Sequence, residues 1–217
     1  SGPGMMELQL TPKAPLIAAD EAQLAKMTIK WTAKRLGLTA TFMAKWHSEH
    51  PGLGTHLHFG PLDKRADRIK NLKAHTQSLM LFFASNINSY KRFVPEEYAP
   101  LRNDYGEGDR TVAFRLLDND RLENRIPGAD SNPYLTIAST LVGMFTETKL
   151  APAPSRSFPR NLREGISTYL ENKELAGHIP EQLAKQFLLS RKMEWEEFMK
   201  DISDFEKSIE SIRTSSV

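Results

Sequence analysis

The stretch that decides the fold is Arg110–Tyr134, RTVAFRLLDNDRLENRIPGADSNPY. Its second half, 121–126 (RLENRI), has the alternation of a β-strand, in which successive side chains point to opposite faces of a sheet. Arg121, Glu123 and Arg125 therefore share one face of the predicted strand, and the apolar residues between and after them share the other face.

A second strand-like run, 111–114 (TVAF), lies just upstream, between Arg110 and Arg115. The turn-forming sequence 118–120 (DND) joins the two runs and predicts a hairpin. The combined face would present four arginines and one carboxylate. Such a face suits phosphates, carboxylates and a divalent cation.

Composition sets broad limits on the function. The 217 residues are 40% hydrophobic and 26% charged, with a formal net charge of +2, which gives no bulk electrostatic reason to expect a nucleic-acid partner. No apolar run approaches the roughly 20 residues of a membrane span. The chain has no cysteine, which removes disulfides and thiolate metal sites and is consistent with the cytoplasm. We therefore expect a cytoplasmic protein with no nucleic-acid and no membrane partner.

Periodicity predicts an α+β fold, with an antiparallel sheet of β-hairpins backed by long helices and with a helical C-terminal extension. Strand patterns occur at 6–10, 39–44 and 52–59, and the last two are expected to pair as a hairpin. Helical patterns occur at 16–36, 63–84, 135–148, 162–170, 180–189 and 191–212.

The Pro/Ser-rich segment 151–159 reads as a linker or surface loop. It divides the chain into a first part, 1–150, and a C-terminal helical segment, 151–217, which we expect to pack on the same domain.

Several residues carry chemistry in more than one interpretation. His56 and His58 would share one strand face, either as ligands of a metal or phosphate or as ordinary strand residues. Glu123 between arginines is either part of an ion-pair network, which the residues alone slightly favour, or a metal ligand. Arg92, in a loop, either grips a carboxylate or lies on the surface. No glycine-rich phosphate loop is present, so arginines, histidine and metal would have to hold any ATP.

Six blocks of sequence, in order over about residues 2–145, resemble the catalytic domain of the glutamine synthetase family, and the helices after them resemble its C-terminal helical segment. The blocks are GPGMMELQL (2–10), TATFMAKW (39–46), GLGTHLH (52–58), NINSYKRFVP (86–95), DRTVAFR (109–115) and RLENRIPGADSNPYL (121–135). The resemblance implies an ATP-dependent ligase, in which ATP phosphorylates the side-chain carboxylate of glutamate and an amine displaces the phosphate.

The same resemblance assigns roles to single residues, and it moves Glu123 from the ion-pair interpretation to that of a metal ligand. The implied metal ligands, for Mg²⁺ or Mn²⁺, are Glu7, His56 and Glu123. The implied ATP-binding residues are His58, Arg110, Arg115 and Arg121, with Arg110 also catalytic. The implied glutamate-binding residues are Gly52, Arg92 and Arg125.

Departures from the family pattern refine the expectation. Tyr98 stands where ammonia-using members have a glutamate, which favours the γ-glutamylpolyamine and γ-glutamylamide synthetase branch and an organic amine as substrate. Met5, Pro51 and Gly60 also replace usual family residues. Two alternatives therefore stay open: a glutamine synthetase that uses ammonia, and a non-catalytic relative with a structural or regulatory role.

Family chains are about twice as long, so the resemblance covers the C-terminal half of their catalytic domain. Family members build each active site between two subunits of a ring. We therefore expect a homo-oligomeric ring for the full-length form and an inactive enzyme for this chain alone.

Overall fold

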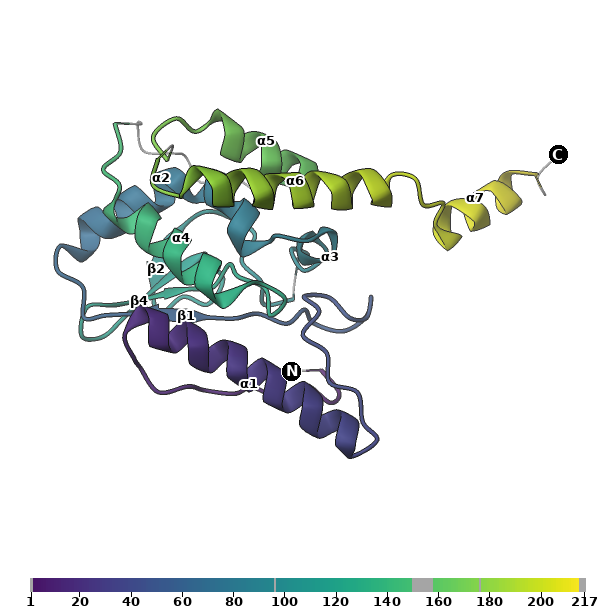
Figure 1. Ribbon diagram of the computed structural model, residues 1–217, viewed down its shortest axis with the longest axis horizontal. Helices are drawn as coiled ribbons and strands as arrows, with labels where there is room; N and C mark the ends of the chain where they lie inside the picture. The colour runs from purple at the N-terminus through teal and green to yellow at the C-terminus, as the bar shows by residue number, and fades with distance from the viewer. Residues whose placement is uncertain (1, 96, 150–157, 176, 215–217) are drawn as a thin grey trace.

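Helices and short strands succeed one another along the chain in the computed structural model, which describes residues 2–95, 97–149, 158–175 and 177–214 (Figure 1). The helices are α1 (Pro15–Arg35), α2 (Arg65–Phe83), α3 (Ile87–Tyr90), α4 (Pro133–Phe145), α5 (Leu162–Glu171), α6 (Glu181–Phe198) and α7 (Asp204–Thr214). The strands are β1 (Leu57–Phe59), β2 (Tyr105–Glu107), β3 (Phe114–Leu117) and β4 (Arg121–Asn124). The predicted α+β class is confirmed.

The strands form one sheet in the order β1-β4-β3-β2. The predicted hairpin is confirmed as β3 and β4, but its first strand is Phe114–Leu117 and not 111–114. Its turn places Asn119 and Asp120 at φ angles of 59° and 54°. Asn and Asp tolerate this left-handed region better than most residues, because their short polar side chains bond locally. β2 pairs parallel with β3, so the sheet is mixed rather than built from hairpins alone.

Two predicted strands are wrong, because residues 6–10 and 39–44 form no strand. Of the predicted strand 52–59, only β1 forms, and it pairs with β4 instead of with 39–44. Backbone bonds extend this pairing past the strands, from Thr55 N to Pro127 O at 2.8 Å and from Ala129 N to Leu53 O at 2.9 Å. Alternation identifies the face of a strand but not its neighbour, which explains the wrong partner.

The apolar face of the sheet packs on helices. Phe114 and Leu122 are completely buried and join the hydrophobic core with α2. α2 and α4 approach closely at Gly143, where an added Cβ would lie 2.6 Å from a methyl carbon of Leu79 and 2.7 Å from one of Leu72. In the view of Figure 1 these helices lie above the sheet and α1 lies below it. The polar face of the sheet is thus left to other contacts.

The predicted helices at 16–36, 63–84, 135–148 and 162–170 are confirmed within a few residues at each end. α4 begins at Pro133 because the side chain of Asn132 accepts hydrogen bonds from Tyr134 N and Leu135 N. Among the described residues, no helix combines the length and the apolar character needed to cross a membrane.

The C-terminal helices differ from their predicted limits. α6 runs without a break to Phe198, and α7 begins only at Asp204, so the predicted division near 190 is wrong. α5 and α6 pack on α2 through aromatic rings, with centroids of Phe82 and Phe187 5.2 Å apart. α7 projects away from the rest of the molecule (Figure 1). Most of the predicted linker 151–159 lies outside the described residues.

Candidate active site

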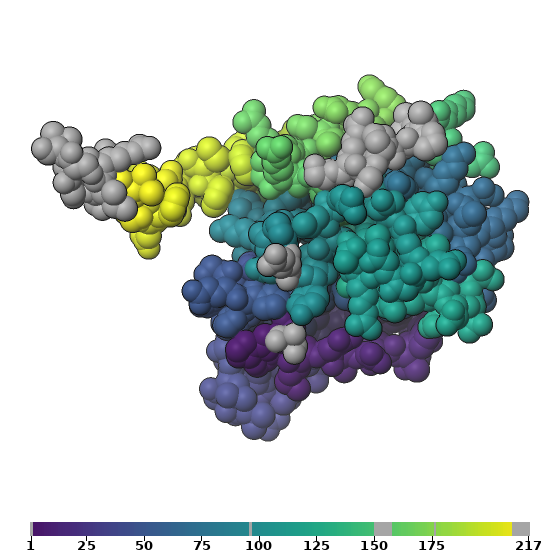
Figure 2. Space-filling view, turned by 180° about the vertical axis from the view of Figure 1, so that it is seen from behind, coloured from purple at the N-terminus to yellow at the C-terminus, as the bar shows by residue number. Residues whose placement is uncertain are grey.

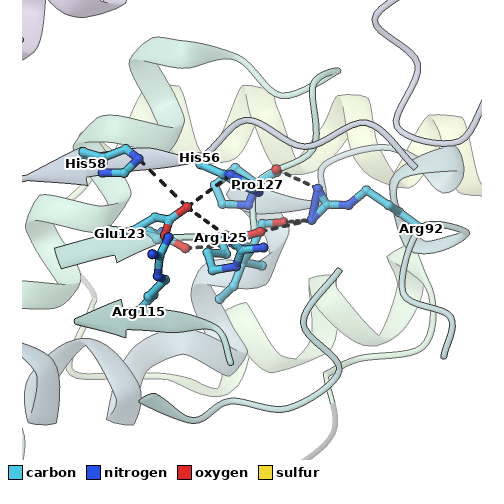
Figure 3. Close-up of polar contacts among 9 residues, drawn as sticks. His56, His58, Arg92, Arg115, Glu123, Arg125 and Pro127 are labelled. Carbon is cyan, nitrogen blue, oxygen red and sulfur yellow. Dashed lines mark hydrogen bonds and ion pairs between the residues drawn. The ribbon is translucent and has the colours of Figure 1, made fainter. Parts of the chain in front are cut away.

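Three neighbouring strands each place one polar side chain in a row across the sheet. The register pairs Glu123 of β4 with His58 of β1 on one side and with Arg115 of β3 on the other. Residues paired in this way share one face, so their side chains lie side by side (Figure 3). Arg115 Nη1 donates to Glu123 Oε2 at 3.1 Å, and His58 Nε2 lies 3.9 Å from Oε1.

A second arginine, which follows β4 two residues after Glu123, also contacts the Glu123 carboxylate. Arg125 Nη1 donates to Glu123 Oε1 at 2.8 Å, and both side chains are nearly buried. Burial raises the pKa of Glu123, but Arg125, the neighbouring His56 and His58 and the hydrogen bond from Arg115 together hold the pKa below its usual value. The carboxylate is therefore ionised near neutral pH and bridges two arginines.

His56 completes the group from the segment before β1. Its Nδ1 lies 3.2 Å from Glu123 Oε1. Burial and the nearby charge of Arg125 lower the pKa of His56 to about 4, so the imidazole is neutral near pH 7. A neutral imidazole beside an ionised carboxylate is a donor set that divalent metals accept.

Arg92 approaches this group from the opposite side of the loop after β4 (Figure 3). Its Nη1 donates to Pro127 O at 2.8 Å, and its Nη2 donates to the carbonyl oxygen of Ile126. The side chain is 2% exposed, and burial lowers its pKa to about 10. The guanidinium of Arg92 thus binds backbone carbonyl oxygens and holds the loop that follows Arg125 in place.

Gly52 makes room for this arginine. A Cβ at position 52 would lie 2.1 Å from Cγ of Arg92 and 2.8 Å from the carbonyl oxygen of Ala44. Any side chain there would displace the stem of Arg92. The structure therefore brings together Gly52 and Arg92, two residues that the family resemblance assigns to one substrate.

Four other predicted site residues lie farther out. Arg110 is exposed and outside the strands, and Arg121 is exposed with its Nε donating to Asp118 O at 3.2 Å. Tyr98 is 72% exposed, at a φ angle of 64°. Glu7 lies in an exposed segment without secondary structure. Of the four arginines predicted for this face, two contact the Glu123 carboxylate. These are Arg115 and Arg125.

A metal site is only partly assembled. His56 and Glu123 are close enough to bind one ion together, but the described residues contain no group of three or more His, Asp or Glu side chains that could hold a metal. Glu7, the other predicted ligand, is not part of the group. The two residues that are present fit a hard divalent cation in charge and donor type.

Sequence reasoning missed a buried ion pair beside the site. Lys45 Nζ contacts Glu97 Oε2 and donates to His50 O at 2.8 Å, and the lysine side chain is 8% exposed. The pair ties the loop that carries Tyr98 to the segment before Gly52. Nothing in the local pattern distinguishes this lysine from a surface lysine, so the sequence gives no signal for it.

A second missed feature supports the loop of Arg92 from behind. Asp130 Oδ2 accepts from Ser89 Oγ at 2.5 Å and from Asn86 Nδ2 at 3.1 Å. From α6, Glu194 Oε1 accepts from Ile87 N at 2.9 Å. The spacing of Asn86 and Ser89 is that of a helix-capping pair, which is the signal that predicts a fixed helix start here.

Three relatives show what the chain is similar to. It is 28% identical to γ-glutamylputrescine synthetase of Escherichia coli (strain K12), over 95% of this chain and 51% of that protein. It is 35% identical to a glutamate–isopropylamine ligase of Pseudomonas sp, over 70% of this chain and 38% of that protein. It is 30% identical to type-1 glutamine synthetase 2 of Dictyostelium discoideum, over 95% of this chain and 47% of that protein. The chain thus spans about half, or less, of the length of these relatives.

Solved structures agree with this likeness. A structure described as a complex of GmaS with ADP superimposes with a TM-score of 0.79 at 25% identity, over 91% of this chain and 55% of the other. GmaS without ligand gives a TM-score of 0.75. Residues 1–71 and 66–209 match the family model described as glutamine synthetase, catalytic domain, and the chain therefore belongs to the glutamine synthetase family.

Proposed function

We propose that the chain is the C-terminal half of the catalytic domain of a ligase that joins the γ-carboxylate of glutamate to an amine. A carboxylate oxygen of glutamate attacks the γ-phosphorus of ATP, and ADP leaves. The amine nitrogen then attacks the acyl carbon of the γ-glutamyl phosphate, phosphate leaves and the nitrogen loses a proton. The observation that carries the proposal is the row of His58, Glu123 and Arg115, with Arg125 and His56 beside it.

Phosphoryl transfer depends mainly on positioning and on stabilising the charge of the phosphates. Arg115 is held by its hydrogen bond to Glu123 and is partly exposed, so its guanidinium is oriented but accessible. We assign Arg115 and His58 to the phosphates of ATP. Arg110 and Arg121, both exposed, would join them when ATP binds, with Arg110 as the catalytic arginine.

We assign Mg²⁺ or Mn²⁺ to Glu123 and His56, with Glu7 as a further ligand. The neutral imidazole and the ionised carboxylate support this assignment, because both are competent ligands near neutral pH. When bound, the metal would neutralise phosphate charge. Arg115 and Arg125 already orient the Glu123 carboxylate that would hold it.

Glutamate is assigned to Gly52, Arg92 and Arg125. Arg92 is bound to carbonyl oxygens of the loop after β4, so its contribution is to keep that loop and Arg125 in place. Its Nε is buried and has no partner among the described residues. Gly52 keeps the space that the stem of Arg92 needs.

An organic amine is the proposed second substrate. Tyr98 is an exposed aromatic side chain, not a carboxylate that could take a proton from ammonium. The similar proteins include enzymes named for putrescine and isopropylamine, and this supports the same choice. Ammonia is the alternative substrate, in line with the similarity to a glutamine synthetase.

For the full-length form we propose a homo-oligomeric ring in the cytoplasm. We also keep the division of this chain into 1–150 and 151–217, with the second part packed on the same domain. Packing of Phe187 on Phe82 and the hydrogen bond of Glu194 to Ile87 support that arrangement. The described residues do not assemble three metal ligands, and we propose that the 217-residue chain alone is inactive.

Calorimetry with Mg²⁺–ATP tests the nucleotide half of this proposal on the 217-residue chain. Arg115→Gln should weaken binding about tenfold or more, because a charge-assisted contact is worth about 1.5–3 kcal/mol. Arg163→Gln, an exposed arginine on α5, is the matched control and should bind normally. Binding that neither substitution alters would contradict the assignment, and a chain that binds no Mg²⁺–ATP would favour the non-catalytic alternative.

Mass spectrometry tests the reaction itself. The chain is joined to the part of the E. coli relative that the match leaves out, and is given ATP and glutamate with putrescine or with ammonium. We expect a γ-glutamyl amide of putrescine as the main product. Glutamine as the main product would favour the ammonia alternative, and steady phosphate release by the 217-residue chain alone would refute its proposed inactivity.

A further inference from the structure

Two histidines outside the group around Glu123 lie against each other on a surface turn. The sequence 46–51 (WHSEHP) places His47 and His50 three positions apart, with a turn at the two residues between them. Residues at the two ends of such a turn come close in space. The ring centroids of His47 and His50 are 4.6 Å apart, with 32° between the ring planes. The turn therefore brings two imidazoles side by side.

The separation of the two rings suits two ligands of one metal ion. An imidazole nitrogen binds Zn²⁺ at about 2.0–2.1 Å, and the centre of the ring lies behind that nitrogen. Two imidazoles that bind one ion at an angle of about 90–110° therefore have ring centroids roughly 4.5–5.3 Å apart. The observed 4.6 Å between His47 and His50 lies within this range. The spacing of the rings thus already fits one ion between them.

An imidazole nitrogen of this pair has a lone pair that an ion can use. The backbone N–H of Glu49 donates to His47 Nδ1 at 3.2 Å, which requires that Nδ1 carries no proton. His47 and Glu49 are exposed, so water can take over this long hydrogen bond when an ion takes the lone pair. Imidazole suits Zn²⁺, Cu²⁺ and Ni²⁺, whereas Mg²⁺ prefers oxygen ligands. The donor type therefore selects a transition-metal ion.

Contacts with the rest of the protein hold this turn in place. Lys45 Nζ donates to His50 O at 2.8 Å, so its side chain spans the turn. The backbone of Lys45 is fixed by Asn88, whose Nδ2 donates to Lys45 O at 2.8 Å. The ring of Trp46 stacks on that of His50, with centroids 5.2 Å apart. A site that is already ordered loses less conformational freedom when it binds a ligand.

The surroundings of the turn are compatible with a bound cation. The ammonium of Lys45 also contacts Glu97 Oε2, and this ion pair offsets its positive charge. The segment 46–50 belongs to the blue surface at the left of the space-filling view, where water has access (Figure 2). The part of the chain that the structure describes has no group of three His, Asp or Glu side chains that could hold a metal. Water would therefore supply the remaining ligands.

We propose that His47 and His50 bind one divalent transition-metal ion of the Zn²⁺ and Cu²⁺ class. The ion would join the two ends of the turn and so stiffen the segment that leads into Gly52. This site shares no residue with the metal site assigned to Glu123, His56 and Glu7. It does not depend on the proposed ligase function.

Tryptophan fluorescence gives a local test of this site. The ring centroid of Trp46 lies 5.4 Å from that of His47 and 5.2 Å from that of His50, and Cu²⁺ quenches an indole at such short range. Titration of the 217-residue chain with Cu²⁺ should therefore quench its fluorescence. Trp46→Phe should remove most of this quenching, because the other two tryptophans, Trp31 and Trp195, lie in different elements.

Substitution of either histidine should weaken the binding of the ion. His47→Gln and His50→Gln should each raise the Cu²⁺ concentration at half-quenching about tenfold or more, because the second imidazole otherwise binds at a high effective concentration. His178→Gln, an exposed histidine elsewhere in the chain, is the matched control and should leave the titration unchanged. Circular dichroism of each variant checks that it is folded.

Calorimetry with Zn²⁺ separates this site from the one assigned to His56. A His56→Gln chain should still bind a Zn²⁺ ion at the turn. Adding His47→Gln to that chain should weaken this binding about tenfold or more. Trp46→Phe should bind Zn²⁺ although it no longer reports Cu²⁺ by fluorescence.

Three results would overturn the proposal. The first is quenching by Cu²⁺ that is as strong in Trp46→Phe as in the unsubstituted chain. The second is a pair of single-histidine variants, His47→Gln and His50→Gln, whose titrations match that of the unsubstituted chain. The third is a His178→Gln variant that loses as much affinity as they do. None of these measurements uses ATP, glutamate or an amine, so their failure would leave the proposed function unaffected.

Discussion

The face around Glu123 and the outer face of α1 lie in one chain but differ in kind. Around Glu123, the carboxylate and Arg125 are nearly buried and paired with each other, Arg115 is partly exposed and also bonded to the carboxylate, and two histidines lie beside it. On α1, apolar side chains such as Leu24 are exposed and have none of this support. The contrast teaches that the described residues hold the charged side chains around Glu123 in place through mutual contacts, whereas they leave the apolar side chains on the outer face of α1 exposed.

The largest expected effect follows the removal of the Glu123 carboxylate, and an unchanged stability would contradict the contrast between the two faces. Glu123→Ala leaves Arg125 buried without its carboxylate, and losing one partner of a buried pair costs about 3–5 kcal/mol. Urea denaturation should show this loss. Glu123→Gln is the control, since it keeps the shape and one acceptor and should lose less. An unchanged midpoint for Glu123→Ala would mean that the two arginines are well solvated without it.

A smaller loss of stability is expected at Gly52, which packs against the stem of Arg92. Gly52→Ala forces a Cβ against Arg92 and the carbonyl of Ala44, and overpacking of this kind costs about 1–3 kcal/mol. Gly106→Ala, whose nearest neighbour would be the Cβ of Asp109 at 3.2 Å, should cost less. Thermal unfolding measures both. Equal losses would show that the contact of Gly52 with Arg92 has no special weight.

Acid should weaken the closed part of the molecule through His75 of α2. Its Nε2 faces Thr146 O at 3.3 Å, and its Nδ1 faces Asn172 Nδ2 at 3.3 Å. Asn172 Oδ1 accepts from Glu174 N, so the amide is fixed with its donor toward the ring, and the imidazole is neutral with its proton on Nε2. Burial lowers the pKa of His75 below its usual 6.5, which fits this neutral form.

Since the unfolded chain then takes up the proton first, stability should fall as the pH drops through about 6.5, by at most about 1.4 kcal/mol per pH unit from this group. The free energy of unfolding against pH, for the unsubstituted chain and for His75→Gln, measures it. The glutamine cannot titrate, so the gap between the two curves should narrow in acid. Parallel curves would rule out a contribution from His75.

The smallest expected effect lies on α1. Leu24→Ser should change the free energy of unfolding of the isolated chain by less than about 0.5 kcal/mol, because the side chain is already exposed. Leu79→Ala, at 0% exposure on α2, should cost about 2–5 kcal/mol. Denaturation of both variants sharpens the contrast between the faces. A large loss for Leu24→Ser would mean that α1 is buried in the isolated chain.

The sequence was sufficient for the α+β class, for most helices and for the β3–β4 hairpin, because these depend on local periodicity and turn residues. Alternation in RLENRI was enough to place Glu123 and Arg125 on one face, where the structure has them. The exposed positions of Arg110, Tyr98 and Glu7 were not predictable in the same way, since each depends on contacts outside its own segment.

The errors have a common physical origin. Strands at 6–10 and 39–44 were expected from alternation and β-propensity. A strand forms only with a neighbouring strand, and the local pattern does not identify that neighbour. The pair of Lys45 and Glu97 joins segments about fifty residues apart, and no local rule connects them. In these places, sequence reasoning cannot identify which distant segment of the chain makes the contact.

The hydrogen bond from Ile87 N to Glu194 has a consequence for the order in which the protein is made. The two residues are separated by 107 positions, and Arg191 donates to Ser85 O from 106 positions away. During synthesis the loop of Arg92 therefore leaves the ribosome long before α6 exists to hold its beginning. The contacts that hold the beginning of this loop can form only after α6 has been translated, so they are a late event of chain growth.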